Sequence, residues 1–396
     1  MGLFDWLKKH KVYCPYCHNE IDTRDGKILY TCSHAGHNEQ KIKSSNSKLE
    51  DRPNCPMCIT DMKDPDNSPI GTRPVDMVVC NAKINSGKGC GHSFPFFLLD
   101  DNIAKVYQVS MLGTSGSGKT VYKSRLRDAI KQCTLFGEDD ENSYTGGDIV
   151  KIQTYKVLPD GTKGNGEVAT ETVDYIGFKI YPGTKKEKYI LLILHDFAGK
   201  DVSSKSPNVE KTIEKSDAVF ITLDPEKNFQ NHLGIGGNYE KDIDIPDVIT
   251  WVKTIRNKRN KKLKIAYIFT QADKPIVRCA LIVCNRAAIL RGEKDRNKLL
   301  WSDEEGKNPV YSKYVDGNLP DCNSILRDFI NTNDPLYDKY ITNTATEKSF
   351  IVSALGMYDM AEYPDGNIDS DGKLLVLPPK IYRVLDPLWW LIFGDK

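Results

Sequence analysis

Gly113-Thr114-Ser115-Gly116-Ser117-Gly118-Lys119-Thr120 is the stretch that decides the fold, because it fits the pattern G-x-x-x-x-G-K-[ST]. It follows the apolar run 105–112, which predicts a β-strand, and precedes a helical pattern over residues 120–135. Glycines let successive backbone N–H groups face a phosphate, and the start of a helix adds favourable partial charge there. We expect Lys119 to span the β- and γ-phosphates and the Thr120 hydroxyl to bind Mg²⁺. The sequence therefore predicts a phosphate-binding loop between a strand and a helix.

Strand-like and helical patterns alternate after this loop. Apolar runs predict further strands at residues 172–181, 189–195, 218–223, 263–270 and 349–354. Helical patterns cover residues 246–257, 323–340 and 379–393. The order is typical of an α/β protein with a mainly parallel sheet between two layers of helices, the three-layer fold of P-loop NTPases.

An acidic residue at a second strand end completes the expected magnesium site. Asp196 follows the apolar run 189–195, where it can hold Mg²⁺ through water. It opens Asp196-Phe197-Ala198-Gly199, which resembles the DxxG switch of GTPases, whose glycine N–H contacts the γ-phosphate. Lys119, Thr120, Asp196 and Gly199 are thus the candidate catalytic residues.

Two later strand ends bear on the choice of base. Thr270-Gln271-Ala272-Asp273 resembles the [NT]KxD guanine motif, in which the aspartate accepts hydrogen bonds from guanine N1 and N2. Gln271 stands where the motif has a lysine that packs on the base. Ser353-Ala354-Leu355 resembles the SA[KL] loop, whose backbone meets guanine O6. In this order behind a phosphate-binding loop, the motifs favour GTP over ATP.

These ordered motifs resemble those of the translation-factor-related (TRAFAC) class of P-loop GTPases over residues 105–396. The closing stretch 381–390 and a zinc-binding N-terminal region are similar to the double-GTPase family of bacterial conflict systems. The resemblance implies a role against invaders beside a protein partner, either a second GTPase or an effector.

Departures from the class pattern bear on hydrolysis. Lys200 stands where Ras-like members have the glutamine that orients the attacking water, so we expect slow intrinsic hydrolysis. His195, or a residue donated by a partner, could compensate. Thr145 and Thr154 are both candidates for the switch I threonine, and Thr145 is preferred.

Cysteines cluster near the N-terminus in a metal-binding pattern. Cys14-Pro15-Tyr16-Cys17 and Cys55-Pro56-Met57-Cys58 are C-P-x-C turns, whose spacing lets two thiolates bind one ion. In sequence order the ligands form two zinc ribbons, namely Cys14, Cys17, Cys32 and His37, then Cys55, Cys58, Cys80 and Cys90. A nested alternative joins Cys14 and Cys17 with Cys80 and Cys90, around a second site of Cys32, Cys55, Cys58 and a histidine. His34 is an alternative to His37, whereas His18 and His92 are expected to bind no metal.

The two zinc ions would be structural, since four protein ligands leave no open position for water. Their region would then serve recognition, and nucleic acid is a candidate partner beside protein. We expect three segments: an amphipathic leader over residues 1–11, the zinc-binding region 12–98, and a GTPase domain over 105–396.

Composition sets the remaining limits. The chain has 396 residues, 39% of them hydrophobic and 28% charged, with a formal net charge of +1, so its overall charge gives no reason to expect nucleic acid. Residues 1–11 lack the apolar core of a secretory signal, and the run 388–393 is too short to span a membrane. We expect a cytoplasmic protein that binds GTP and GDP. The alternatives are a nucleotide-regulated binding module with negligible turnover and an ATPase with the same loop.

Overall fold

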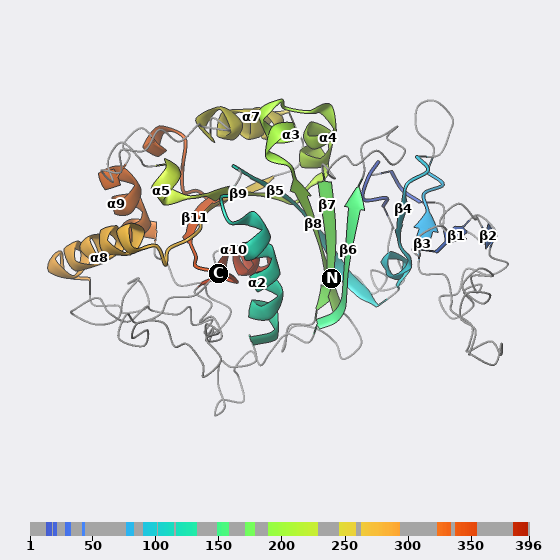
Figure 1. Cartoon of the computed structure of the whole chain (residues 1–396), viewed down its shortest axis with the longest axis horizontal. Helices are drawn as coiled ribbons and strands as arrows, with labels where there is room; N and C mark the ends of the chain where they lie inside the picture. The colour runs from blue at the N-terminus through green and yellow to red at the C-terminus, as the bar shows by residue number, and fades with distance from the viewer. Residues whose placement is uncertain are drawn as a thin grey trace, which may run out of the picture. The chain divides into compact units, whose positions relative to one another are not determined.

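The chain divides into two compact units, Met1–Lys105 and Val106–Lys396, which are described separately (Figure 1). The structure is a computed structural model. It describes residues 13–17, 19–21, 28–32, 42–43, 77–82, 90–100, 102–114, 116–132, 149–157, 171–178, 189–228, 245–258, 263–293, 323–333, 337–354 and 383–394.

The first unit contains a small antiparallel sheet of four strands in the order β2-β1-β3-β4. These strands are β1 (Leu29–Thr31), β2 (Ile42–Lys43), β3 (Met77–Val79) and β4 (Ser93–Pro95), and a 3-10 helix, η3 (Phe96–Leu99), follows them. Tyr30, Val78 and Phe94 lie side by side across three strands and are fully buried. Strands β1 and β3 lead directly into Cys32 and Cys80.

The second unit is built on a sheet of seven strands in the order β11-β10-β9-β5-β8-β7-β6. Their bounds are β5 (Ile103–Gly113), β6 (Ile149–Val157), β7 (Glu171–Phe178), β8 (Tyr189–Phe197), β9 (Ala218–Leu223), β10 (Lys264–Phe269) and β11 (Glu347–Ile351). Strands β5, β9, β10 and β11 are mutually parallel, whereas β6, β7 and β8 form an antiparallel meander. The α/β class and the parallel character of the sheet are confirmed, and the meander is an addition that the sequence did not predict.

Helices cover both faces of this sheet (Figure 1). They are α2 (Lys119–Gln132), α3 (Gly199–Ser203), α4 (Pro207–Lys215), α5 (Pro225–Asn228), α7 (Ile245–Asn257), α8 (Pro275–Leu290), α9 (Asn323–Asn333) and α10 (Asp386–Phe393), with a 3-10 helix, η6 (Tyr337–Lys339). Helices α2 and α10 share one hydrophobic core with the sheet, and α3, α4, α7, α8 and α9 share the other.

Strand β10 shows why the central segments read as unbroken apolar runs. Ile265, Tyr267 and Phe269 enter the core under α7, α8 and α9, while Ala266 and Ile268 enter the core under α2 and α10. Side chains alternate between the faces of a strand, so a strand covered on both sides must be apolar at every position. This double burial explains the runs from which the strands were predicted.

The strand order changes direction at β5. The chain runs from β5 to the β8 side of the sheet, and then returns to place β9 on the other side of β5. In open α/β sheets, ligands bind outside the carboxyl ends of the strands at such a point. The Gly-rich loop follows the carboxyl end of β5, and the fold therefore places it where a ligand site is expected.

The C-terminal helix α10 belongs to the core. Trp389 and Trp390 are buried, and Phe350 of β11 lies 5.7 Å from the Trp390 ring centroid to centroid. The Lys264 ammonium donates to the carbonyls of Trp390 (3.0 Å) and Leu391 (3.2 Å), which satisfies acceptors that a helix end leaves open. The predicted helix over 379–393 is thus present from residue 386, and residues 379–382 lie outside the described part of the chain.

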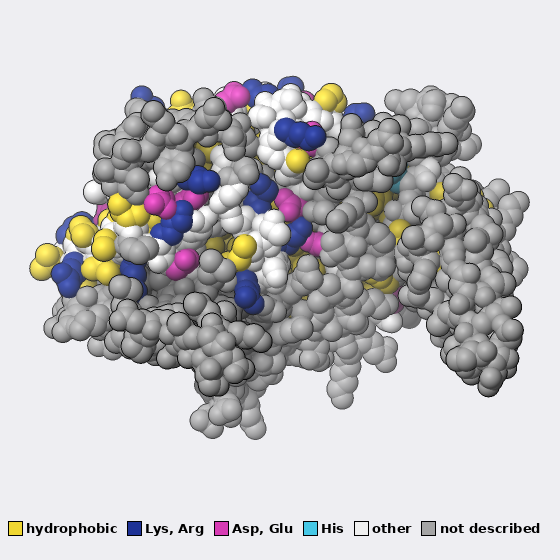
Figure 2. All heavy atoms as spheres, viewed as in Figure 1, with side chains coloured by type: hydrophobic (Ala, Val, Ile, Leu, Met, Phe, Trp, Pro, Cys, Tyr) yellow, Lys and Arg dark blue, Asp and Glu magenta, His cyan; other side chains and the backbone are white. Residues whose placement is uncertain are grey.

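Helix α8 was not predicted from the sequence. One side packs in the core through Val277, Leu281 and Cys284, but Val283 and Leu290 are 62% and 88% exposed. Yellow apolar and dark blue basic side chains are mixed on the surface where Figure 1 places α8 (Figure 2). Apolar residues on both sides of α8 blur the one-sided pattern from which a surface helix is recognised. Among the described helices, none combines the length and apolar content needed to cross a membrane.

Candidate functional site

The loop from Gly113 to Thr120 approaches strand β9 so closely that only glycine fits at its start. A Cβ atom on Gly113 would lie 2.2 Å from Thr222 Oγ1 and 2.7 Å from the Thr222 carbonyl oxygen. Gly118 has a φ of +80°, a conformation that side-chain-bearing residues rarely adopt. Ser115 lies outside the described residues. The glycines of the motif are thus required by contacts and backbone shape at this turn.

Polar side chains at the carboxyl ends of β9 and β10 hold the loop in place. Ser117 Oγ and Thr222 Oγ1 lie 2.8 Å apart, and Thr270 Oγ1 donates to the Ser117 carbonyl at 2.6 Å. Gln271 Nε2 donates to the Gly116 carbonyl at 2.9 Å. Gln271, predicted to lie against the base, therefore also braces the loop through its side chain.

Predicted site residues from three motifs converge on one pocket of about 350 Å³, a size typical of small-molecule sites, whereas Asp196 and Gly199 are not among its lining residues. Its lining residues are Thr114, Gly116, Ser117, Gly118, Lys119, Thr120, Val121, Thr270, Gln271, Asp273 and Ala354. They come from the turns that follow β5, β10 and β11. The structure thus brings together three motifs that are far apart in the sequence.

Asp273 lies in this pocket with one carboxylate oxygen already engaged. Ser353 Oγ donates to Asp273 Oδ1 at 2.5 Å. Among the described residues, Asp273 has no other hydrogen-bond partner, so Oδ2 is available to a ligand. Leu355, the third residue of the predicted loop, lies outside the described part of the chain. Ser353 therefore orients the carboxylate that was predicted to recognise the base.

Lys119 is folded against the loop. Its ammonium donates to the carbonyls of Gly113 (2.9 Å) and Thr114 (3.4 Å). Burial lowers the pKa of Lys119, and the negative charge of Asp196 partly offsets this effect. Thr120, by contrast, is exposed at the pocket wall. An anionic ligand would supply the ammonium with a stronger partner than the two carbonyls.

Asp196 does not line the pocket and has an internal cationic partner. Lys123 of α2 lies 3.2 Å from Asp196 Oδ2 and 2.9 Å from Asp174 Oδ2 on β7. Sequence reasoning missed both Lys123 and Asp174. One signal was present for Lys123, because it follows Lys119 by four residues and so shares its side of the helix.

The segment after Asp196 passes directly into α3, which begins at Gly199. His195 is fully buried, and its ring lies 6.3 Å from the Phe197 ring, centroid to centroid. Because residues alternate along β8, His195 and Phe197 lie on the sheet face opposite Asp196. His195 therefore cannot reach a ligand in this conformation, whereas Lys200 is exposed at the start of α3. Thr145 lies outside the described residues, and Thr154 is a residue of β6.

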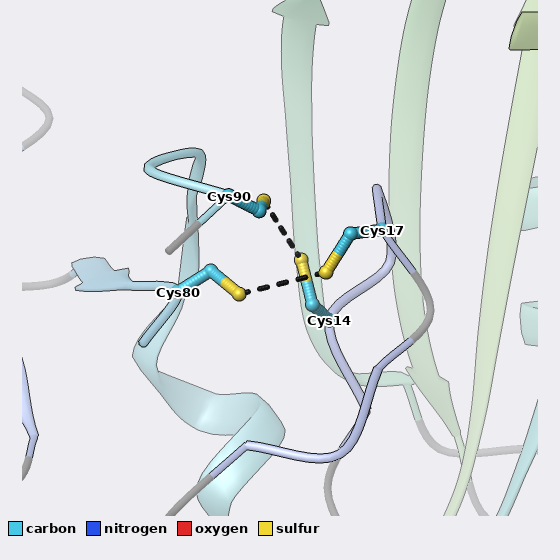
Figure 3. Close-up of side chains that lie close together, drawn as sticks. All are labelled: Cys14, Cys17, Cys80 and Cys90. Atoms are coloured by element: carbon cyan, nitrogen blue, oxygen red, sulfur yellow. Dashed lines mark hydrogen bonds between the residues drawn. The ribbon is translucent and has the colours of Figure 1, made fainter. Parts of the chain in front are cut away.

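Four cysteines of the first unit form a second candidate site (Figure 3). The sulfur atoms of Cys14, Cys17, Cys80 and Cys90 all lie within 4.8 Å of one another. Cys14 and Cys90 are separated by 3.7 Å, as are Cys17 and Cys80. The four sulfurs point toward one another from the N-terminal turn and from both sides of the segment between β3 and β4 (Figure 3).

The geometry of this cluster fits a tetrahedral metal ion. Four sulfurs at the usual Zn–S distance of about 2.3 Å stand about 3.8 Å apart, close to the two separations above. Hydrogen bonding with Cys14 lowers the pKa of Cys17 to about 7 and that of Cys90 well below its ordinary value, while the pKa of Cys14 is raised. The pKa of Cys80 is also raised, so without a metal the thiolate, the form that binds metal, is favoured at Cys17 and Cys90 and the thiol at Cys14 and Cys80.

The sequential assignment of zinc ligands was wrong for this site, and the nested alternative matches the structure. The pairing of β1 with β3 explains why. Leu29 pairs with Val79 and Thr31 with Met77, so β1 and β3 are antiparallel. Cys32 follows β1 and Cys80 follows β3, and the two cysteines therefore lie at opposite ends of this strand pair. Cys32 therefore cannot complete a site with Cys14 and Cys17. Cys55, Cys58, His34 and His37 lie outside the described residues, where the second predicted site remains a prediction.

His92 was expected to bind no metal, but it contacts the cluster. Its Nδ1 lies 3.3 Å from Cys90 Sγ, and its ring stacks on Tyr16 with centroids 4.8 Å apart and an angle of 24°. A metal-bound thiolate carries no proton, so this contact requires hydrogen on Nδ1. His92 therefore joins the Cys90 side of the cluster to the turn that carries Cys14 and Cys17.

His92→Phe is expected to weaken zinc binding by about tenfold, because it removes a hydrogen bond to a ligand while keeping an aromatic ring against Tyr16. Competition with a chromophoric zinc chelator would measure the change. Tyr16→Phe, which also keeps the ring, is the matched control and should bind zinc like the wild type. Equal zinc affinity of His92→Phe and wild type would contradict a supporting role for His92.

A scan against protein-family models and a search of curated proteins returned no match to this chain. The site must therefore be interpreted from its own geometry and chemistry.

Proposed function

We propose that this chain is a Mg²⁺-dependent switch that binds and hydrolyses GTP, with the P-loop fold of the TRAFAC class. The observation that carries the proposal is the shared pocket. The Gly-rich loop, Lys119 and Thr120 line it together with Asp273 and Ala354. A nucleoside triphosphate has the matching polarity, with an anionic chain at one end and a hydrogen-bonding base at the other.

The phosphate end has the chemistry that a triphosphate needs. Backbone N–H groups of a glycine-rich turn at the start of α2 supply hydrogen bonds without charge, and Lys119 supplies a positive charge. The exposed Thr120 hydroxyl and the nearby Asp196 carboxylate are oxygen donors of the kind Mg²⁺ prefers. Mg²⁺ would neutralise charge on the phosphates, and Thr120 and Asp196 would hold it.

The base end favours guanine. A carboxylate is an acceptor only, and guanine presents two adjacent donors, N1–H and the N2 amino group, whereas adenine presents an acceptor at N1 beside a single donor, the N6 amino group. Asp273, oriented by Ser353, supplies the acceptor. A pocket with an acceptor placed to pair with the base discriminates against ligands that leave it unpaired. In an ATPase, the weaker alternative, Asp273 would face at most one donor group of the base.

Hydrolysis would be coupled to movement through the segment 196–199. Asp196 ends β8 and Gly199 begins α3, so any shift of these residues toward the γ-phosphate is transmitted to a helix. The exposed Lys200 and the buried His195 leave no described side chain beside Asp196 suited to activating water. We infer slow intrinsic hydrolysis that a partner accelerates.

The same observation favours a second candidate function, a nucleotide-regulated binding module with negligible turnover. In both readings the cysteine cluster holds structural zinc in a ribbon-like unit that recognises a partner. A second GTPase or an effector in a bacterial conflict system is the partner that the sequence resemblance implies, and nucleic acid is a further candidate. Single-turnover kinetics separate the switch from the binding module.

Wild-type protein mixed with less than one equivalent of radiolabelled GTP and Mg²⁺ is expected to release labelled phosphate slowly, and Lys119→Ala is expected to release none. Loss of the ammonium removes the main positive charge at the β- and γ-phosphates. Lys211→Ala, which removes an exposed lysine on α4, is the control and should match the wild type. Equal rates of phosphate release by Lys119→Ala and wild type would contradict the enzymatic proposal. Binding of GTP without release of phosphate by the wild type would favour the binding module.

A further inference from the structure

Two lysines one turn apart on α2 have different partners. Lys119 donates to carbonyls of the Gly-rich loop, whereas Lys123 forms ion pairs with Asp174 and Asp196. The side chains of this triad, Lys123, Asp174 and Asp196, are 8%, 0% and 11% exposed. Water therefore screens their interactions weakly. The triad links α2 to two strands of the meander, β7 and β8.

The triad holds one ammonium against two carboxylates, so one negative charge is in excess. Asp174 and Asp196 project from the same face of neighbouring strands, since Thr172 pairs with Asp196 and Asp174 with Leu194. Lys123 lies between them and prevents two buried carboxylates from facing each other unpaired. Its ammonium is also 3.2 Å from Asp196 Oδ2, an oxygen that could otherwise bind a divalent cation.

We propose that Lys123 is a positioning residue that competes with Mg²⁺ for Asp196. This role rests on the proposed nucleotide function, because it assigns Asp196 to the metal of a bound nucleotide. Asp174 gives Lys123 a second partner, so the ammonium stays paired when Asp196 turns toward a metal. Because Mg²⁺ must displace Lys123, a higher Mg²⁺ concentration is needed before Asp196 binds the metal. The contact between Asp196 and Mg²⁺ is therefore sensitive to the nucleotide state.

Two sets of variants move the Mg²⁺ requirement in opposite directions. Lys123→Met/Asp174→Asn keeps the net charge of the triad but frees Asp196 from its ammonium. It should lower the half-saturating Mg²⁺ concentration for binding of a fluorescent GTP analogue by about tenfold. Asp174→Asn alone leaves Lys123 with Asp196 as its single carboxylate partner in the triad, and it should raise that concentration several-fold.

Matched controls separate this effect from loss of structure. Lys205→Met/Asp247→Asn removes a partly exposed ion pair elsewhere and should leave the Mg²⁺ requirement unchanged. Lys123→Arg retains a cation and should keep the requirement near that of the wild type. A structural role alone would change stability without moving the Mg²⁺ titration.

The outcomes distinguish this role from the function on which it rests. Wild-type protein that binds no GTP analogue at any Mg²⁺ concentration would overturn the proposed function and this role together. Binding with the same Mg²⁺ requirement in wild type, in Lys123→Met/Asp174→Asn and in Asp174→Asn would overturn the role of Lys123 alone. If the double variant fails to fold, Asp174→Asn decides the question, and an unchanged requirement in it contradicts the proposal.

Discussion

Cys80→Ser is expected to lower the zinc content of the purified protein by one ion per chain and to leave the first unit open to proteolysis. The four sulfurs of Cys14, Cys17, Cys80 and Cys90 form one cluster whose dimensions fit a tetrahedral ion, and a serine hydroxyl replaces a thiolate poorly as a ligand. In small metal-bound units the free energy of metal binding is largely the free energy of folding. Strands β1 to β4 are only two or three residues long, so we expect metal binding to add much to the stability of this unit.

Metal content would be measured by mass spectrometry of the acid-digested protein, and cleavage by limited proteolysis. Cys284→Ser removes a buried thiol of α8 that lies outside the cluster, and it should leave the zinc content unchanged. The nested arrangement also predicts that Cys14→Ser/Cys80→Ser loses no more zinc than either single variant. Loss of one ion by each single variant and two by the double would restore the sequential pairing.

Gly113→Ala is expected to destabilise the second unit by about 3 kcal/mol, at the upper end of the cost of overpacking a close contact. The added Cβ would lie 2.2 Å from Thr222 Oγ1 and 2.7 Å from the backbone oxygen of the same residue. The backbone of β9 cannot yield without disturbing the centre of the sheet, so the loop must move away from its partners Thr222 and Thr270. Nucleotide binding should be lost with it.

Urea unfolding followed by circular dichroism would measure the change in stability. Gly292→Ala is the matched control, because Gly292 also has a positive φ (+97°) but an added Cβ would meet no atom within 4 Å. Its cost should be limited to backbone strain of about 1 kcal/mol. Equal destabilisation by the two substitutions would show that the contact with Thr222 has no part in shaping the loop.

The parallel part of the sheet could be predicted from the sequence, because a strand buried on both faces is an unbroken run of apolar residues. Strand β9 agrees with its predicted residues, and β10 and β5 differ only at their ends. Strand β6 was missed, because polar residues interrupt the apolar run from which the other strands were predicted. Helix α8 was missed because its exposed side is also partly apolar. Strand β6 lacks an unbroken apolar run and α8 lacks a one-sided apolar pattern, the two signals on which the other predictions were based.

Part of the candidate site could also be predicted from the sequence, and part could not. The loop at Gly113 and the turn at Asp273 were found from local motifs, whose spacing is fixed by backbone geometry. The cysteine pairing was left open because it depends on how β1 pairs with β3, a long-range property that spacing alone does not determine. The roles of Lys123 and His92 were missed for a similar reason, since each depends on contacts with residues on distant strands or turns.

The affinity of the purified protein for GTP and for ATP, measured by calorimetry in Mg²⁺, tests the central claim most directly. The pocket predicts that GTP binds more tightly than ATP. It also predicts that Asp273→Asn weakens GTP binding by about tenfold to a hundredfold while leaving ATP binding unchanged, because an amide then faces the guanine donors. Equal affinities for GTP and ATP in the wild type, or no binding of either nucleotide, would contradict the account.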